Sequence, residues 1–173
     1  MPFSYITISN GYNNVRLRKG VISLVDDRKL IGELNKILTL EHGHLGMYEN
    51  YPDYKDKDIR RTFRRFMEIE IEHINKLKNT IRNLGGKPFA IVESGNIIGR
   101  MLGITIQVSD IKNTLGSYSL IEKKSFEGYS KFVLDLEEDA EKRNQFIAEI
   151  AVSNMLEADL MHLWLKDKLK TMR

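Results

Sequence analysis

Residues 63–81 read FRRFMEIEIEHINKLKNTI, and this stretch decides the fold. Its apolar side chains recur at spacings of three and four, which places them on one face of an α-helix. Glu70 and His73 fall on that same face, between Phe66 and Leu77. Because the apolar face of a helix packs inward, the stretch predicts a core helix that sends a carboxylate and an imidazole into the protein.

Other segments show the same helical period. We expect a first helix that begins near Asp26-Asp27, where the aspartates are available as caps, and ends at about residue 50. A last helix should cover residues 140–170. The helix quoted above should end before Gly85-Gly86, because glycine favours the left-handed turn that closes a helix.

The remaining parts of the chain are less regular. In residues 94–136, Gly99, Gly103 and Gly116 interrupt a helical pattern, so this segment predicts two helices or one broken helix. Residues 1–25 include short alternating runs and predict a hairpin or an irregular arm. We therefore expect an all-α protein, with a four-helix bundle over residues 26–173 that has an extra helix or a broken third helix.

Composition narrows the chemistry. At 173 residues and 42% hydrophobic, the chain can bury one core, and it has no cysteine, so a metal would be held by nitrogen and oxygen. Its net charge of +3 is spread along the chain, and no nucleic-acid partner is expected. The longest apolar segment, residues 97–108, is too short to span a membrane. We expect a cytoplasmic protein with at most peripheral contact at the inner face of the membrane.

Each predicted bundle helix carries an acid on its apolar face, and two of them add a histidine one turn later. These six side chains are Glu41, Glu70, His73, Glu122, Asp159 and His162. Burying four unpaired carboxylates is costly, so they need neutralising partners. Internal lysines or arginines would serve, but a pair of divalent cations also explains the imidazoles. The pattern therefore predicts a dinuclear metal site with these six ligands.

Four further side chains lie close to this predicted site. His44, one turn after a predicted ligand, is an extra ligand, an imidazole that supports the ligands from outside, or an imidazole that is merely packed in the core. Glu157 competes with Asp159 as the acid of the last helix. Tyr48 and Tyr129 each follow an inward glutamate by seven residues, which suits a hydrogen bond to a ligand, a radical site or an ordinary core position.

The ligand pattern resembles two groups of proteins. A glutamate from each of two helices, with Glu-x-x-His from the other two, is the set of ferritin-like di-iron and di-manganese proteins. Several motifs are also similar to those of the demethoxyubiquinone hydroxylases. These motifs are Glu41-x-Gly43 with Tyr48, Glu70-Ile71-Glu72-His73, Lys87-Pro88, Asn96-x-x-Gly99-x-x-x-Gly103, and Glu122 with Tyr129. The chain departs from that family at Asp159, where the family has glutamate, and at Gly128, where it tends to have histidine.

The resemblance implies a di-iron monooxygenase that uses dioxygen and an external electron donor to hydroxylate a quinone-like or other hydrophobic substrate. Two iron ions are the implied cofactor, and manganese suits the same ligands. A homodimer is compatible with the sequence. The same residues would also serve a rubrerythrin-like peroxidase or oxidase, or a ferritin-like iron-binding protein. A metal-free helical interaction module is the alternative without chemistry.

Overall fold

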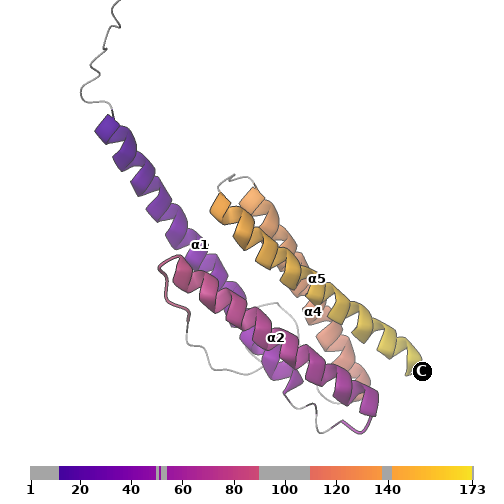
Figure 1. The fold of residues 1–173 in the computed structure, drawn as a ribbon. Coiled ribbons are helices and arrows are strands. Elements are labelled where there is room, and N and C mark those ends of the chain that lie inside the picture. The colour runs from indigo at the N-terminus through magenta and orange to yellow at the C-terminus, as the bar shows by residue number, and fades with distance from the viewer. Residues whose placement is uncertain (1–11, 50, 52–53, 90–109, 138–141, 173) are drawn as a thin grey trace, which may run out of the picture.

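The computed structural model describes residues 12–49, 51, 54–89, 110–137 and 142–172, and they form four long helices. These helices are α1 (Tyr12–Tyr48), α2 (Lys57–Asn83), α4 (Ile111–Glu137) and α5 (Lys142–Thr171). Helix α1 pairs with α2, α4 pairs with α5, and α2 also contacts α5 (Figure 1). The predicted all-α four-helix bundle is confirmed.

Local sequence sets both ends of α2. Asp56 has an extended backbone at the N-cap, and its carboxylate accepts hydrogen bonds from the backbone N–H groups of Asp58 and Ile59. At the other end, Gly85 has a φ of 76°, and the N–H of Gly86 donates to the carbonyl of Ile81 at 2.9 Å. This left-handed turn is the stop that the glycine pair predicts.

The prediction for the N-terminal region is wrong from residue 12 onward. Helix α1 begins at Tyr12, so Val15 and Leu17 are helical and do not belong to a hairpin. Asp26 and Asp27 lie inside α1 and cannot cap its start. The alternating pattern that suggested strands covers only a few residues. So short a run cannot distinguish the two-residue period of a strand from the 3.6-residue period of a helix. Residues 1–11 of the predicted arm lie outside the described residues.

The third long helix is continuous from Ile111 to Glu137, and neither Gly116 nor Gly128 breaks it. The part of the predicted extra or broken helix that falls at residues 90–109 lies outside the described residues, so that prediction stays open. No described helix has the length and hydrophobicity that crossing a membrane requires.

The bundle core is divided into two apolar clusters. One includes Leu34 and Leu38 of α1, and the other includes Met47 and Tyr48 of the same helix. Between them along α1 come Glu41 and His44, which are buried although polar. In α2, α4 and α5 too, a short polar interval separates the residues of one apolar cluster from those of the other. The four helices therefore place a polar layer in the middle of an otherwise apolar interior.

Candidate metal centre

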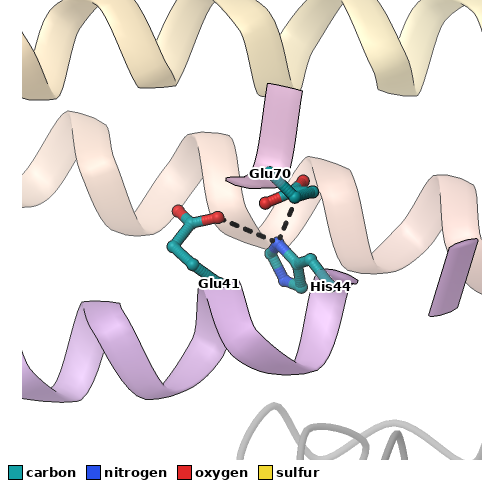
Figure 2. A group of neighbouring side chains, drawn as sticks. All are labelled: Glu41, His44 and Glu70. Atoms are coloured by element: carbon teal, nitrogen blue, oxygen red, sulfur yellow. Dashed lines mark ion pairs between the residues drawn. The ribbon is translucent and has the colours of Figure 1, made fainter. Parts of the chain in front are cut away.

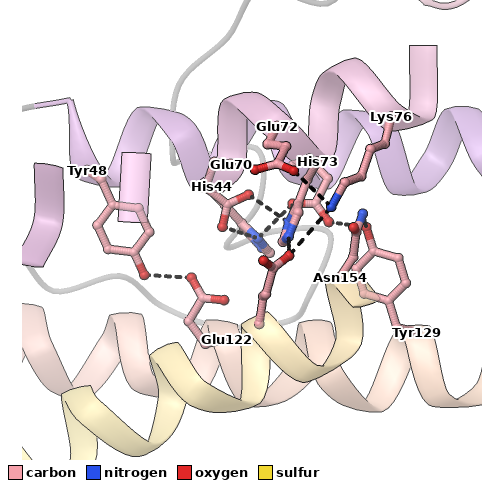
Figure 3. A network of polar contacts seen from close by, with 11 residues as sticks. His44, Tyr48, Glu70, Glu72, His73, Lys76, Glu122, Tyr129 and Asn154 are labelled. Carbon is pink, nitrogen blue, oxygen red and sulfur yellow. Dashed lines mark hydrogen bonds and ion pairs between the residues drawn. The ribbon is translucent and has the colours of Figure 1, made fainter. Parts of the chain in front are cut away.

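The polar layer consists of carboxylates and imidazoles that are almost completely removed from solvent. Glu41 and His44 come from α1, Glu70 and His73 from α2, and Glu122 from α4, and each residue is at most 1% exposed. Figure 3 shows that His44, Glu70, His73 and Glu122 gather in the space between the helices. The helical spacing explains this, because residues three apart share a face and point in the same direction.

The closest group of possible ligands joins the first two helices. Nδ1 of His44 lies 3.6 Å from Oε2 of Glu41 and 3.8 Å from Oε1 of Glu70 (Figure 2). One ligand atom from each of these three residues lies within 4.8 Å of the others, which is close enough for all three to hold one metal ion. Both Glu-x-x-His pairs that meet here come from the α1–α2 hairpin.

His73 extends this group toward α5. Its Nδ1 lies 3.4 Å from Oε2 of Glu41 and 3.7 Å from Oε2 of Glu70. Its other ring nitrogen, Nε2, lies 2.7 Å from Oε2 of Glu157. The imidazole therefore stands between the buried carboxylates and a carboxylate whose side chain is 31% exposed.

Two tyrosines hold the carboxylates across the bundle in a matching pair of contacts. The Tyr48 hydroxyl of α1 donates to Oε1 of Glu122 on α4 at 2.6 Å, and the Tyr129 hydroxyl of α4 donates to Oε1 of Glu41 on α1. Nδ2 of Asn154 donates to the Tyr129 hydroxyl at 3.0 Å. Burial, and then the neighbouring glutamate charges, raise the pKa of both phenols well above the ordinary value, so both remain donors.

Burial and mutual repulsion disfavour the ionised form of several of these acids. Burial, with the charge of Glu41 next to it, raises the pKa of Glu70 well above its ordinary value. Burial also raises the pKa of Glu122. Although burial disfavours its charge too, contacts with Glu70 and with both imidazoles hold the pKa of Glu41 well below its ordinary value. The ionised form of Glu41 is therefore favoured, whereas the ionised forms of Glu70 and Glu122 are disfavoured.

The charged forms of the two buried imidazoles are favoured, because neighbouring carboxylates raise their pKa values. Burial lowers the pKa of His44, but the charge of Glu122 and the contact with Glu41 outweigh it and raise the pKa to about 9. For His73 the contacts with Glu157 and Glu41 outweigh burial and raise the pKa to about 12. In the metal-free protein both imidazoles are therefore cations at neutral pH.

Four of the six predicted ligands are brought together, and the two from the last helix are not. Asp159 is half-buried, and it makes no ion pair or hydrogen bond with the other described residues. Nδ1 of His162 donates to the backbone carbonyl of Ser119 at 2.7 Å, and no contact between His162 and the buried acids is found among the described residues. The structure does not bring Asp159 and His162 to the buried acids, and their binding of metal stays a prediction.

The reason is the rotation of α5. The face predicted to point inward contains Asp159 and His162, and both residues are only half-buried. The buried stripe is one residue earlier: Ala151, Asn154, Ala158, Met161 and Leu165. Successive residues are rotated by about 100° around the axis of a helix. A shift of one residue therefore moves the predicted face from the inward side of α5 to its flank. Alanine gives a weak hydrophobic signal, which concealed the true face.

Two residues have more central places than the sequence indicated. His44 lies inside the cluster, and its Glu-x-x-His spacing from Glu41 was the available signal. Asn154, which is fully buried, was not predicted at all, and only its position midway between two inward alanines could have revealed it. Glu157, the alternative acid of the last helix, reaches the group through His73.

The polar layer fits a cation, and lysine and arginine side chains do not neutralise its acids in the described part of the chain. Among the described residues, no lysine or arginine forms an ion pair with Glu41, Glu70 or Glu122. Both nitrogens of His44, both carboxylate oxygens of Glu70 and Oε2 of Glu122 have no hydrogen-bond partner within the described chain. Buried polar atoms are normally satisfied, so this group of atoms indicates a missing partner that accepts lone pairs, as a metal ion does.

The bundle and its buried carboxylate–imidazole layer define the chain as an all-α protein with the ferritin-like fold. A bacterioferritin from Desulfovibrio desulfuricans with a diiron site superposes with a TM-score of 0.67 at 16% identity, covering 83% of this chain and 80% of that one. A ferritin-like diiron-carboxylate protein from Bacillus anthracis gives 0.64 at 20% identity, covering 83% and 97%.

Comparison of the sequence with known proteins does not assign this chain to a family. No protein-family model matches the chain. No curated protein matches it either. At these identities the structural neighbours establish the fold and not the reaction. The resemblance to the demethoxyubiquinone hydroxylases stays a prediction, because its distinguishing Asn96, Gly99 and Gly103 lie outside the described residues.

Proposed function

We propose that this chain is a di-iron carboxylate protein whose buried centre reacts with dioxygen or peroxide. The observation that carries the proposal is the set of unsatisfied atoms on His44, Glu70 and Glu122, which lie in a layer that excludes water. An ordinary core would not keep so many buried polar atoms without partners. A pair of divalent cations would satisfy them together.

Five residues of three helices would hold the metal. Glu41, His44, Glu70, His73 and Glu122 offer only carboxylate oxygen and imidazole nitrogen, a donor set that suits iron and also accepts manganese. Iron bound there would supply electrons to dioxygen or peroxide. The cysteine-free chain offers no thiolate for an electron relay, so an external donor would restore the reduced state.

The surrounding side chains orient these ligands. Tyr48 occupies Oε1 of Glu122 and leaves Oε2 without a partner, facing the layer. Tyr129 occupies Oε1 of Glu41, while Oε2 of Glu41 faces both imidazoles. Each tyrosine therefore fixes which carboxylate oxygen is available for a metal, and the two apolar clusters above and below exclude water.

A finer proposal concerns the substrate. Hydroxylation of a quinone-like or other hydrophobic molecule is supported by the motif resemblance, which includes Glu41, Tyr48 and Glu122 as well as residues outside the described chain. An oxidase or peroxidase that needs no organic substrate uses the same centre. Quinol-dependent uptake of dioxygen with a hydroxylated product would support the oxygenase. Uptake that follows ferrous iron or peroxide alone would support the oxidase or peroxidase.

The metal itself is tested by elemental analysis of protein purified from iron-supplemented medium. The wild type should contain about two iron equivalents, as expected for a dinuclear carboxylate centre. Glu70→Ala removes a fully buried carboxylate and should lose most of this iron. Glu68→Ala is the matched control, because Glu68 lies on the same helix but pairs with Arg64 and Arg65 on the surface. Equal iron in all three proteins, or none in the wild type, would contradict the proposal.

A further inference from the structure

Glu157 of α5 contacts the buried layer without belonging to it. Its side chain is 31% exposed, whereas that of His73, which it touches, is 1% exposed. The two groups are 2.7 Å apart, within the range of a strong charge-assisted hydrogen bond. A carboxylate that reaches from the surface to a buried imidazole is not needed for packing and calls for a functional explanation.

The two nitrogens of His73 face different partners. Nδ1 is directed at the carboxylates of Glu41 and Glu70, at 3.4 and 3.7 Å. Nε2 is directed at Glu157. A neutral imidazole has one lone pair and one N–H, so the partner of one nitrogen decides what the other can do. With the hydrogen on Nε2, the lone pair of Nδ1 faces the interior acids.

A lysine one turn further along α2 secures Glu157 from outside. Nζ of Lys76 lies 3.8 Å from Oε2 of Glu157 and 3.3 Å from Oε1 of Glu72. Figure 3 shows Lys76 and Glu72 at the edge of the cluster, next to His73. The ammonium group favours the ionised form of Glu157 and restricts where its carboxylate can lie. The arrangement leads from solvent through Lys76 and Glu157 to His73.

We propose that Glu157 is a positioning residue of the metal centre, which holds His73 in the tautomer with its hydrogen on Nε2 and thereby presents Nδ1 as the metal-binding nitrogen. The inference rests on the proposed function, because it presupposes a metal. A carboxylate behind a ligating imidazole fixes the orientation of the ring and strengthens its donor nitrogen. Glu157 would act through His73 and would not bind the metal itself.

His44 provides an internal contrast. It is as deeply buried as His73, but neither of its nitrogens has a hydrogen-bond partner among the described residues. Within the part of the chain that the structure describes, no carboxylate makes a hydrogen bond to His44 as Glu157 does to His73. The two imidazoles are therefore unequal, and the position served by His73 should bind its metal more tightly than the position served by His44.

The test measures binding of cobalt(II) by its visible absorption in the wild type, Glu157→Ala, Glu157→Gln and Glu72→Gln. Glu157→Ala should weaken binding about 10- to 100-fold with an unchanged number of bound ions. Glu157→Gln should be intermediate, since its amide oxygen still accepts from Nε2–H. Glu72→Gln is the matched control, because Glu72 contacts Lys76 but not His73, and it should bind as the wild type does.

A second readout separates positioning from a general loss of structure. Nitrogen NMR of the zinc-loaded wild type should show His73 with its hydrogen on Nε2, and circular dichroism of the metal-free variants should match the wild type. Unchanged affinity in Glu157→Ala, a hydrogen on Nδ1, or the loss of a whole metal equivalent in Glu157→Gln would each overturn the inference. Absence of cobalt binding in the wild type would instead contradict the proposed function.

Discussion

The hydroxyl of Tyr48 on α1 donates a 2.6 Å hydrogen bond to the carboxylate of Glu122 on α4, which joins the two helix hairpins through the buried layer. Both residues have no measurable exposure, so no water can take over either role. Its counterpart, Tyr129 with Glu41, joins the same helices in the opposite direction. These two hydrogen bonds hold the helix hairpins together and also orient the buried carboxylates.

Replacing Tyr48 by phenylalanine should therefore destabilise the metal-free protein. Oε1 of Glu122 would lose its donor while staying buried, which costs about 1–3 kcal/mol. Urea unfolding should show this decrease. Tyr51→Phe is a suitable control, because Tyr51 is a half-buried tyrosine that packs on the same apolar cluster. Equal stability of Tyr48→Phe and the wild type would show that the hydrogen bond contributes nothing net.

Metal binding should release protons and tighten as the pH rises. In the metal-free protein the pKa of His44 is about 9 and that of His73 about 12, so both are protonated near neutral pH. A metal ion needs their neutral forms, and each proton displaced below these pKa values makes the affinity rise up to about tenfold per pH unit. Zinc titrations between about pH 6 and about pH 8 measure this slope. An affinity that does not change with pH would be incompatible with cationic imidazoles in the metal-free protein.

His44 and His162, which both lie outside α2, should differ sharply in their importance for metal binding. His44→Ala removes an imidazole from the buried layer and should lower the bound iron. His162→Ala removes an imidazole that is bonded to Ser119, and should leave the iron content unchanged. Elemental analysis of both variants gives the comparison. The reverse result would mean that α5 presents its Asp159 face to the metal.

The start of α2 offers a prediction that is independent of the metal. Asp56→Ala removes the N-cap and should cost about 1 kcal/mol of unfolding free energy. Asp56→Asn keeps an oxygen for the N–H groups of Asp58 and Ile59 but loses the charge that pairs with Lys168 at 3.0 Å. Exposed ion pairs contribute little, so the Asn variant should stay near the wild type in thermal unfolding. Equal losses in both variants would assign the effect to the ion pair.

The sequence predicted three helix faces well because large side chains mark them. In α2, Phe63, Phe66 and Leu77 are buried together with Glu70 and His73, as their spacing indicates. The acids of α1 and α4 follow the same logic, so most of the polar layer could be predicted. Whether these residues bind metal stays a prediction, since spacing and burial fix positions and not occupancy.

Helix α5 was misjudged because large apolar side chains lie outside its inward face as well as on it. Leu156, Leu160 and Leu163 are 53%, 65% and 49% exposed, whereas Ala151 and Ala158 face the core. A hydrophobic pattern cannot show this inversion, because the close approach of helices at an alanine is a property of the packed bundle. The contact between Glu157 and His73 likewise depends on how α5 is rotated against α2.

The central claim is that two metal ions balance the acids of the buried layer, and anomalous X-ray scattering from crystals grown with iron tests it most directly. The account predicts two iron peaks among Glu41, His44, Glu70, His73 and Glu122, with none near Asp159 and His162. Crystals that contain iron elsewhere but show no peak in this layer, with water or basic side chains there instead, would contradict it.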